Sequence, residues 1–331
     1  MFETITNQTS NNNSHETKKK QKVTIHLTGF GPFAGVKENP TTLIIETLKN
    51  ENFALSSPIT NNDYEINPIH YSIIETSMKA VQQYFEEMKC NSGGGDDDSK
   101  YPSIDIFIHF GVSGNSIMYE LEERAKNEKT FRARDEQGEQ PLNEPINEDL
   151  PIDSFLHCNL TTHLNSIIES VNLKLHENSL HPPLSQLVLE SARYKLRRIN
   201  MTGTLGGVKS TKNALSSNPN EDFIQKQLEE LRTDLQESLS LITNAGAFCK
   251  ASQDAGLFIC NYCYYHSLQY STCGDVSRNG LDYNNKKDEM QKKSQRKCYS
   301  LFVHVPPHDV IPVKVQVEFV KTLLQVIVES L

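Results

Sequence analysis

Mainly apolar runs alternate with amphipathic stretches along most of the chain. Apolar runs that each end in a turn rich in Gly or Pro predict buried strands at residues 23–27, 104–110 and 301–305. Apolar residues spaced three and four apart predict helices at residues 73–88, 155–171, 221–240 and 315–331. Such alternation is typical of a layered α/β protein, in which ligands usually bind at the ends of the sheet strands.

Four polar segments interrupt this pattern. Residues 1–21 contain too few apolar groups to repay the entropy of ordering, so we expect a disordered tail followed by one folded domain over residues 22–331. Residues 91–100, 203–221 and 274–297 have the composition of linkers, and we predict that they are loop insertions in that domain.

Composition and charge narrow the classes of function. The chain has 331 residues, of which 37% are hydrophobic and 23% charged, and its formal net charge of -9 argues against a nucleic-acid partner, since such proteins usually concentrate positive charge. The sequence has no run of 18 or more apolar residues, which is the length needed to span a membrane. Its N-terminal region lacks the apolar core of a secretory signal. The seven cysteines are scattered and odd in number, so we expect free thiols and a cytoplasmic protein.

The turn after the first predicted strand, residues 28–33, reads TGFGPF. Two aromatic rings held between glycines and a proline form a stiff apolar wall. The glycines lack the spacing of a dinucleotide site, and no Lys-Ser/Thr follows them as in a phosphate loop. Taken alone, Phe30 and Phe33 are more often core aromatics than ligand contacts.

Cys260 is the best placed nucleophile of the chain. It follows an apolar stretch and opens a predicted helix, whose positive N-terminal field favours a thiolate. Taken alone, such a cysteine is more often a buried structural residue, because free cysteines are among the most buried residue types. A redox pair with Cys263 has the required spacing, but the surrounding sequence is unlike that of a thioredoxin.

His304 ends the last predicted strand, just before Pro306 and Pro307. A lone histidine there is usually structural, so a catalytic role requires a thiol within reach and a group that orients the ring. Acidic residues near position 122 could orient it, but residue chemistry alone does not choose among them. Most of these acids are expected to be solvated, namely Glu120, Glu123, Glu128, Glu136 and Glu139.

Together these segments resemble the pyroglutamyl-peptidase I (pyrrolidone carboxyl peptidase) family of cysteine peptidases. The family's opening motif is matched by Thr28, Gly29, Phe30, Pro32, Phe33 and Asn39. Its nucleophile motif is matched by Ala255, Gly256, Phe258, Cys260 and Asn261, and its histidine motif by Phe302, His304 and Pro306. Counting forward from Gly111 reaches Glu122, after which the family's further residues fall without a gap on Asn127, Arg132, Asp135, Gly138, Gln140 and Pro141. The resemblance covers residues 23–45, 62–90, 101–172 and 240–331.

The resemblance implies a three-layer α/β/α sandwich with a mixed, mainly parallel sheet, similar to phosphorylase and hydrolase folds. It implies that Cys260 attacks, His304 is its base, and Glu122 orients the histidine, with Asp135 as the alternative orienting group. Arg132 would support the oxyanion. Phe30 and Phe33 would bind the flat lactam ring, with Asn39 bracing the turn or bonding near the ring.

The implied activity is hydrolysis of an N-terminal pyroglutamyl residue from peptides, with no cofactor, no metal, no nucleic acid and no membrane. The sequence around Cys249 is similar to the nucleophile motif around Cys260. However, Cys249 follows its glycine one residue too early, and Lys250 stands where the motif has Asn. We therefore expect Cys249 to be a structural thiol on a strand. Two other classes stay open. The chain could be an inactive family member that serves as a peptide-binding or scaffold protein, or a phosphorylase-like enzyme acting on a small molecule.

Overall fold

The computed structural model describes most of the chain in five stretches. They are residues 20–55 (without 34, 35 and 37), 64–91, 103–178 (without 115), 247–276 and 297–331, together with residues 182, 186–194, 197, 229, 232, 233, 236 and 240. All structural statements below concern these residues.

A seven-stranded sheet forms the centre of the molecule. Its strands are β1 (Gln21–Phe30), β2 (Tyr64–Ile66), β3 (His70–Ile74), β4 (Ile104–Val112), β5 (Tyr119–Glu122), β8 (Cys249–Ser252) and β9 (Lys297–Val305). The order is β2-β1-β4-β9-β5-β8, and β3 also pairs with β1. All pairs are parallel except that between β5 and β9. The sheet is therefore mixed and mainly parallel, as expected.

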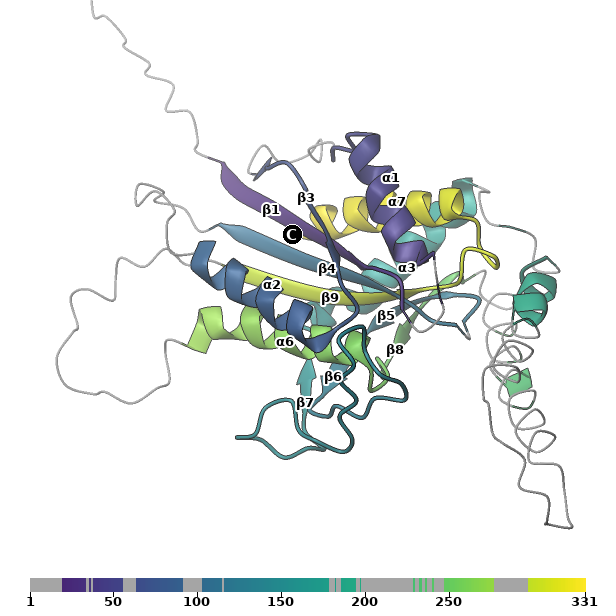
Figure 1. The fold of residues 1–331 in the computed structure, drawn as a ribbon. Coiled ribbons are helices and arrows are strands. Elements are labelled where there is room, and N and C mark those ends of the chain that lie inside the picture. Colours follow the sequence, from purple (N-terminus) through teal and green to yellow (C-terminus); the bar gives the residue numbers. More distant parts are fainter. Residues whose placement is uncertain are drawn as a thin grey trace, which may run out of the picture.

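Helices cover both faces of this sheet (Figure 1). One face carries α1 (Pro40–Asn50), α3 (Thr161–Asn178) and α7 (Val313–Glu329), which contact one another through α7. The other carries α2 (Met78–Asn91) and α6 (Ile259–Val276), which pack side by side. A separate pair of strands, β6 (Arg124–Lys126) and β7 (Phe155–His157), lies beside α6. The predicted α/β/α sandwich is confirmed.

The three predicted central strands are confirmed because both of their faces are covered. In β4 every residue from Ile104 to Gly111 is buried, and in β9 the last six residues are buried. A strand that is buried on both faces reads as a nearly continuous apolar run, which is the pattern that marked these segments in the sequence.

Two predicted helices begin later than their apolar pattern indicates. The segment 73–88 starts as β3, whose Ile74 pairs with Phe30, and α2 begins only at Met78 after Ser77, whose Oγ accepts the Ala80 N–H at 3.2 Å. The segment 155–171 starts as β7, which pairs with β6, before α3 begins. In both cases sheet pairing prevails over helical spacing. The predicted helix 315–331 is confirmed as α7, whereas the predicted helix 221–240 lies mainly outside the described residues.

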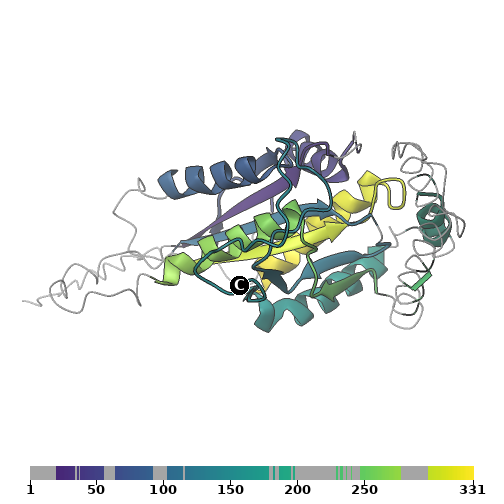
Figure 2. The same cartoon turned by 60° about the horizontal axis from the view of Figure 1, so that its bottom comes forward.

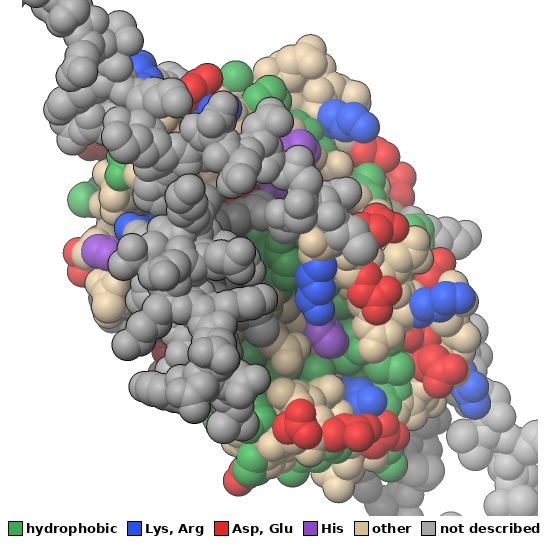
Figure 3. All heavy atoms as spheres, turned by 90° about the vertical axis from the view of Figure 1, so that its left-hand side faces the viewer, with side chains coloured by type: hydrophobic (Ala, Val, Ile, Leu, Met, Phe, Trp, Pro, Cys, Tyr) green, Lys and Arg blue, Asp and Glu red, His purple; other side chains and the backbone are tan. Residues whose placement is uncertain are grey.

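The polar tail and the three predicted insertions lie almost entirely outside the described residues. The exceptions are positions at their ends: residues 20 and 21 lead into β1, residue 91 ends α2, residues 274–276 end α6, and residue 297 begins β9. The domain boundaries therefore remain predictions. Among the described helices, none has the length and apolar character needed to cross a membrane. On the face shown in Figure 3, the described basic side chains lie among acidic ones, so this face carries both signs of charge.

Candidate active site

The predicted site residues other than Asp135 lie near the ends of β1, β4 and β9 and the start of α6. Because β4 and β9 are parallel and in register, Gly111 lies beside His304, while the antiparallel pair of β5 and β9 places Glu120 on the other side of His304. In Figure 2, α6 crosses over β9, and the two elements are in contact. The sheet register thus brings the histidine to the start of the helix that carries Cys260.

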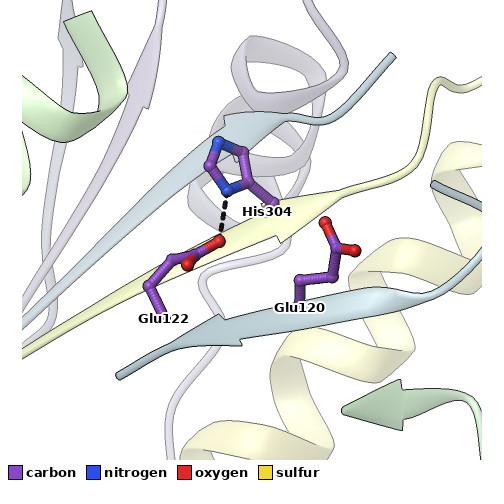
Figure 4. Close-up of side chains that lie close together, drawn as sticks. All are labelled: Glu120, Glu122 and His304. Carbon is purple, nitrogen blue, oxygen red and sulfur yellow. Dashed lines mark hydrogen bonds and ion pairs between the residues drawn. The ribbon is translucent and has the colours of Figure 1, made fainter. Parts of the chain in front are cut away.

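His304 and Glu122 are in direct contact (Figure 4). The ring Nδ1 lies 2.7 Å from Glu122 Oε1, and the carboxyl group is fully buried. The backbone carbonyl of Glu122 accepts a hydrogen bond of 2.8 Å from the Tyr264 hydroxyl on α6. This geometry places Glu122 where an orienting group must lie.

Asp135 lies elsewhere and has a different set of contacts. Its Oδ2 accepts the Met78 N–H at the start of α2, and its Oδ1 accepts the N–H groups of Gln137 and Glu139. Asp135 therefore ties its loop to α2, and the structure does not bring it to His304. We propose Glu122 rather than Asp135 as the orienting group.

Cys260 lies in the first turn of α6, as its sequence pattern predicts. The turn before it contains Gly256 with a φ of 73°, a backbone conformation that favours glycine. On its other side, Asn261 fixes the helix start to β6: its Oδ1 accepts the Lys126 N–H at 2.8 Å and its Nδ2 donates to the carbonyls of Lys126 and Glu128. Cys260 is partly exposed, whereas Cys249 and Cys263 are buried.

Gly111 lies directly beneath the thiol. A Cβ at this position would lie 2.7 Å from a ring carbon of Phe302 and 3.0 Å from Cys260 Sγ. The site is packed so closely that only a hydrogen atom fits between the strand and the sulfur.

The charge state of His304 depends on its two partners. Burial alone lowers the pKa of the imidazole, but charge and hydrogen-bond interactions with Cys260 and Glu122 raise it well above its usual value. Since Nδ1 contacts Glu122, we infer that the hydrogen bond of the His304 ring to Cys260 involves Nε2. By contrast, burial raises the pKa of the thiols of Cys249 and Cys263, so both stay protonated. Cys249 on β8 thus has the surroundings expected of a structural thiol.

A cavity of about 420 Å³ opens above this group. It is lined by Cys260 and His304, by all four residues that were predicted to contact or support the substrate, and by Thr76 and Phe258. Those four are Phe30, Phe33, Asn39 and Arg132.

The two aromatic residues of the first turn have different surroundings. The ring centroid of Phe33 lies 6.4 Å from that of Phe258, and its side chain is partly exposed. Phe30 is only 2% exposed, and its ring lies 6.4 Å from that of Phe302 in the core. Phe33 is therefore a wall of the cavity, whereas Phe30 is also a core residue.

Asn39 and Arg132 occupy the turn and the rim of the cavity. Asn39 is buried at the start of α1, where its Nδ2 donates to the Gly31 carbonyl at 3.0 Å and its Oδ1 accepts from the Thr41 N–H and hydroxyl. These contacts brace the aromatic turn. Arg132 is exposed, and its guanidinium carbon lies 6.0 Å from the centre of the Phe258 ring.

Glu120 and Glu128 contradict the expectation that the acids around Glu122 are solvated. The Glu120 side chain is 18% exposed and lines the cavity, and Glu128 is 8% exposed. The alternation Tyr119-Glu120-Leu121-Glu122 could have revealed Glu120, because residues two apart on a strand point to the same face. Together, Glu120, Glu122 and His304 are the group of described side chains that could hold a metal ion.

Comparisons with known proteins point to one family. No protein-family model matches the chain. A pyrrolidone-carboxylate peptidase of Treponema denticola is 26% identical over 147 residues, which make up 44% of this chain and 56% of that protein. The match thus spans about half the length of that relative. It confirms the resemblance that the sequence motifs indicate.

Solved structures show similar chains. A mutant pyrrolidone carboxyl peptidase of Pyrococcus furiosus is 19% identical, with a TM-score of 0.47 over 92% of this chain and 98% of that one. Pyroglutamyl peptidase I of Bacillus amyloliquefaciens is 16% identical, with a TM-score of 0.47 over 92% of this chain and 97% of that one.

Proposed function

We propose that this chain, a relative of pyrrolidone carboxyl peptidases, is a cytoplasmic cysteine peptidase that removes an N-terminal pyroglutamyl residue from peptides. The observation that carries the proposal is the line of contacts from Cys260 through His304 to Glu122 at the base of a cavity with aromatic walls. A thiol, an imidazole and a buried carboxylate in this order are the parts that nucleophilic acyl transfer requires.

The reaction proceeds through a thioester. Cys260 Sγ attacks the carbonyl carbon of the pyroglutamyl residue, and His304 takes the thiol proton and passes it to the amine of the departing peptide. His304 then removes a proton from a water molecule, whose oxygen attacks the thioester carbon and releases pyroglutamate. Cys260 leaves as the thiolate, and the proton taken up by His304 restores the resting pair of sulfur and imidazole. The raised pKa of His304 supports a charged ring next to the sulfur in the resting enzyme, with Glu122 stabilising that charge.

The start of α6 supplies donors for the oxyanion. The backbone N–H of Cys260 lies in the first turn of the helix, where N–H groups have no acceptor within the helix, so it is free to donate to the developing negative charge. Arg132 at the rim adds positive charge. The lactam ring stacks between Phe30 and Phe33. An unmodified N-terminal Glu or Gln would be rejected, because its ammonium group would lose its hydration between these rings without gaining a partner.

Activity toward a pyroglutamyl amide tests the proposal. The purified chain under reducing conditions should release the fluorophore from a fluorogenic pyroglutamyl amide, Cys260→Ala should not, and Cys249→Ala should behave like the unmodified protein. Full activity of Cys260→Ala would contradict the proposed mechanism. Binding of a pyroglutamyl peptide without turnover would instead favour the inactive peptide-binding protein.

Thiol labelling gives an independent readout. Iodoacetamide should modify Cys260 before Cys249 or Cys263, because burial raises the pKa of those two thiols. Mass spectrometry of tryptic peptides at increasing labelling times identifies the order. A chelator should cause no loss of activity, because no step of this chemistry uses a metal.

A further inference from the structure

The ladder between β5 and β9 ends before β5 does. Glu120 pairs with His304 and Leu121 with Val303, and this antiparallel register would next place Glu122 opposite Phe302. That third pair is not formed, although both residues lie within their strands. The two strands therefore separate at the residue whose carboxyl group contacts His304.

The hydroxyl of Tyr264 lies where the two strands separate. Tyr264 is on α6, about one helical turn after Cys260, and its side chain is fully buried. Its hydroxyl donates to the Glu122 carbonyl at 2.8 Å and also hydrogen-bonds the backbone of Phe302, the residue opposite. One hydroxyl thus bridges the two strands at the position of the missing pair.

Tyr264 is packed against β9 and stays neutral. Its ring centroid lies 5.8 Å from that of Phe302, whose ring centroid in turn lies 5.0 Å from that of His304. Burial raises the pKa of the Tyr264 hydroxyl well above its usual value, so the group keeps its proton and remains a donor. Tyr264 is therefore an uncharged link from the helix of the thiol to the end of β5.

The carboxyl group of Glu122 has few contacts of its own. Its Oε1 lies 2.7 Å from His304 Nδ1, whereas its Oε2 has no hydrogen-bond partner among the described residues. In Figure 4 the side chain extends from the end of β5 to the histidine ring. Its position is therefore set by the backbone, which pairs with Ser252 of β8 on one side and meets the Tyr264 hydroxyl on the other.

We propose that Tyr264 is a positioning residue, whose hydroxyl holds the end of β5 so that Glu122 stays in contact with His304. The same bond ties this contact to α6, and so to the helix that carries Cys260. Without the hydroxyl, the Glu122 carbonyl would be buried without this donor, and the end of β5 would have to move to find another. The role in turnover rests on the proposed peptidase function, whereas the position of the carboxylate does not.

Two neighbouring tyrosines offer a matched pair of substitutions. Tyr264→Phe removes one oxygen and with it the bond to Glu122. Tyr265→Phe removes the same atom from the next residue, which is 1% exposed and whose hydroxyl has no hydrogen-bond partner among the described residues. An effect of both substitutions reports the loss of a buried hydroxyl, and an effect of Tyr264→Phe alone reports the bond to β5.

The pH dependence of kcat/KM for a pyroglutamyl amide tests the role in turnover. Burial lowers the pKa of His304, whereas Cys260 and Glu122 raise it, so a looser contact with Glu122 should lower it. Tyr264→Phe should therefore move the alkaline limb to lower pH by about half a unit or more and reduce kcat roughly tenfold, with KM changed less. The acid limb should stay, because the imidazole is charged on both sides of it. Tyr265→Phe should keep the profile of the unmodified chain, and identical profiles of the two variants would refute the role in turnover.

A second readout does not need turnover. In the full-length Cys260→Ala protein, an NMR titration of the His304 ring gives its pKa, and the loss of a signal in His304→Gln identifies that ring. Adding Tyr264→Phe should lower this pKa by about half a unit or more, while adding Tyr265→Phe should not. An unchanged value, or the same fall with both substitutions, would overturn the proposal. A chain without turnover that shows the fall with Tyr264→Phe alone would refute the peptidase function and leave the positioning role standing.

Thermal melts show whether each variant is folded in these measurements. If Tyr264→Phe unfolds below the assay temperature, sucrose is added to all samples, because an osmolyte excluded from the protein surface favours the compact state. Both tyrosine variants are then compared in the same buffer, and the same outcomes decide.

Discussion

At the scale of single residues, the two aromatic side chains of the first turn are expected to differ in what they contribute. Phe33 is partly exposed in the cavity wall, so Phe33→Ala should lower kcat/KM for a pyroglutamyl amide roughly 10- to 100-fold with little change in Tm. Phe30 is 2% exposed, so Phe30→Ala should also destabilise the fold, since truncating a core Phe costs about 3–5 kcal/mol. Steady-state kinetics and thermal melts separate the two effects. A Phe33→Ala protein that melts far lower yet cleaves normally would remove Phe33 from the site.

Gly111 is expected to tolerate no side chain, because a methyl group would lie 3.0 Å from Cys260 Sγ and 2.7 Å from Phe302. Gly111→Ala should therefore push the sulfur away from His304 and reduce kcat by at least tenfold, and iodoacetamide should label Cys260 more slowly. Gly31→Ala is the matched control, since its added Cβ would meet nothing closer than 3.8 Å. Equal kinetics of the two variants would show that the sulfur can move without loss of activity.

At the scale of secondary-structure elements, a buried hydrogen-bond chain joins the strand of the aromatic turn to the helix of the thiol. His109 on β4 bonds Thr28 on β1 at 2.6 Å and Ser267 on α6 at 2.7 Å, and Ser267 also bonds Ser300 on β9 at 2.7 Å. Burial, together with a smaller effect of the nearby His26, lowers the pKa of His109 to about 3. The ring is therefore neutral, and its two nitrogens can form one hydrogen bond as donor and one as acceptor with the hydroxyl groups of Thr28 and Ser267.

This buried ring predicts a loss of stability in acid. Between pH of about 6.5 and about 3, the unfolded chain binds a proton at His109 that the folded chain does not, so the contribution is complete above pH 6.5 and declines as the pH falls toward 3. The loss should be on the order of a few kcal/mol. Urea denaturation at pH 7, 5 and 4 should show a shallower decline for His109→Gln, with exposed His163→Gln as the control. The same decline in both variants would contradict a role for His109.

At the scale of the whole molecule, the chain leaves the sandwich after α6 and returns at β9. In Figure 1 the end of α6 and the start of β9 both lie at the left of the view, at the same end of the sheet strands. Replacing residues 278–295 by a short Gly-Ser linker should preserve a cooperative melt and the activity, because their composition is typical of a linker and loop length affects closure entropy only slowly. Circular dichroism melts and the fluorogenic assay check this. Loss of the cooperative transition would mean that the segment contributes to the fold.

The sequence by itself determined the central strands and the positions of the two side chains that we propose as reacting groups. Strands buried on both faces must be apolar throughout, so β1, β4 and β9 were legible as apolar runs. The sequence placed Cys260 at the start of a helix and His304 at the end of a strand before two prolines, but only the resemblance to a known family predicted that these two residues react. Both the apolar runs and the positions of these two side chains depend only on residues that are close together in the sequence.

Only the tertiary structure decided which acid meets the histidine. Glu122 and Asp135 are both compatible with the sequence, and the antiparallel register of β5 with β9 places Glu122 at His304 while Asp135 binds the start of α2. The same register turns Glu120 from an apparent surface acid into a wall of the cavity. Pairing between strands that are about 180 residues apart depends on how the whole sheet closes, and no local pattern records it.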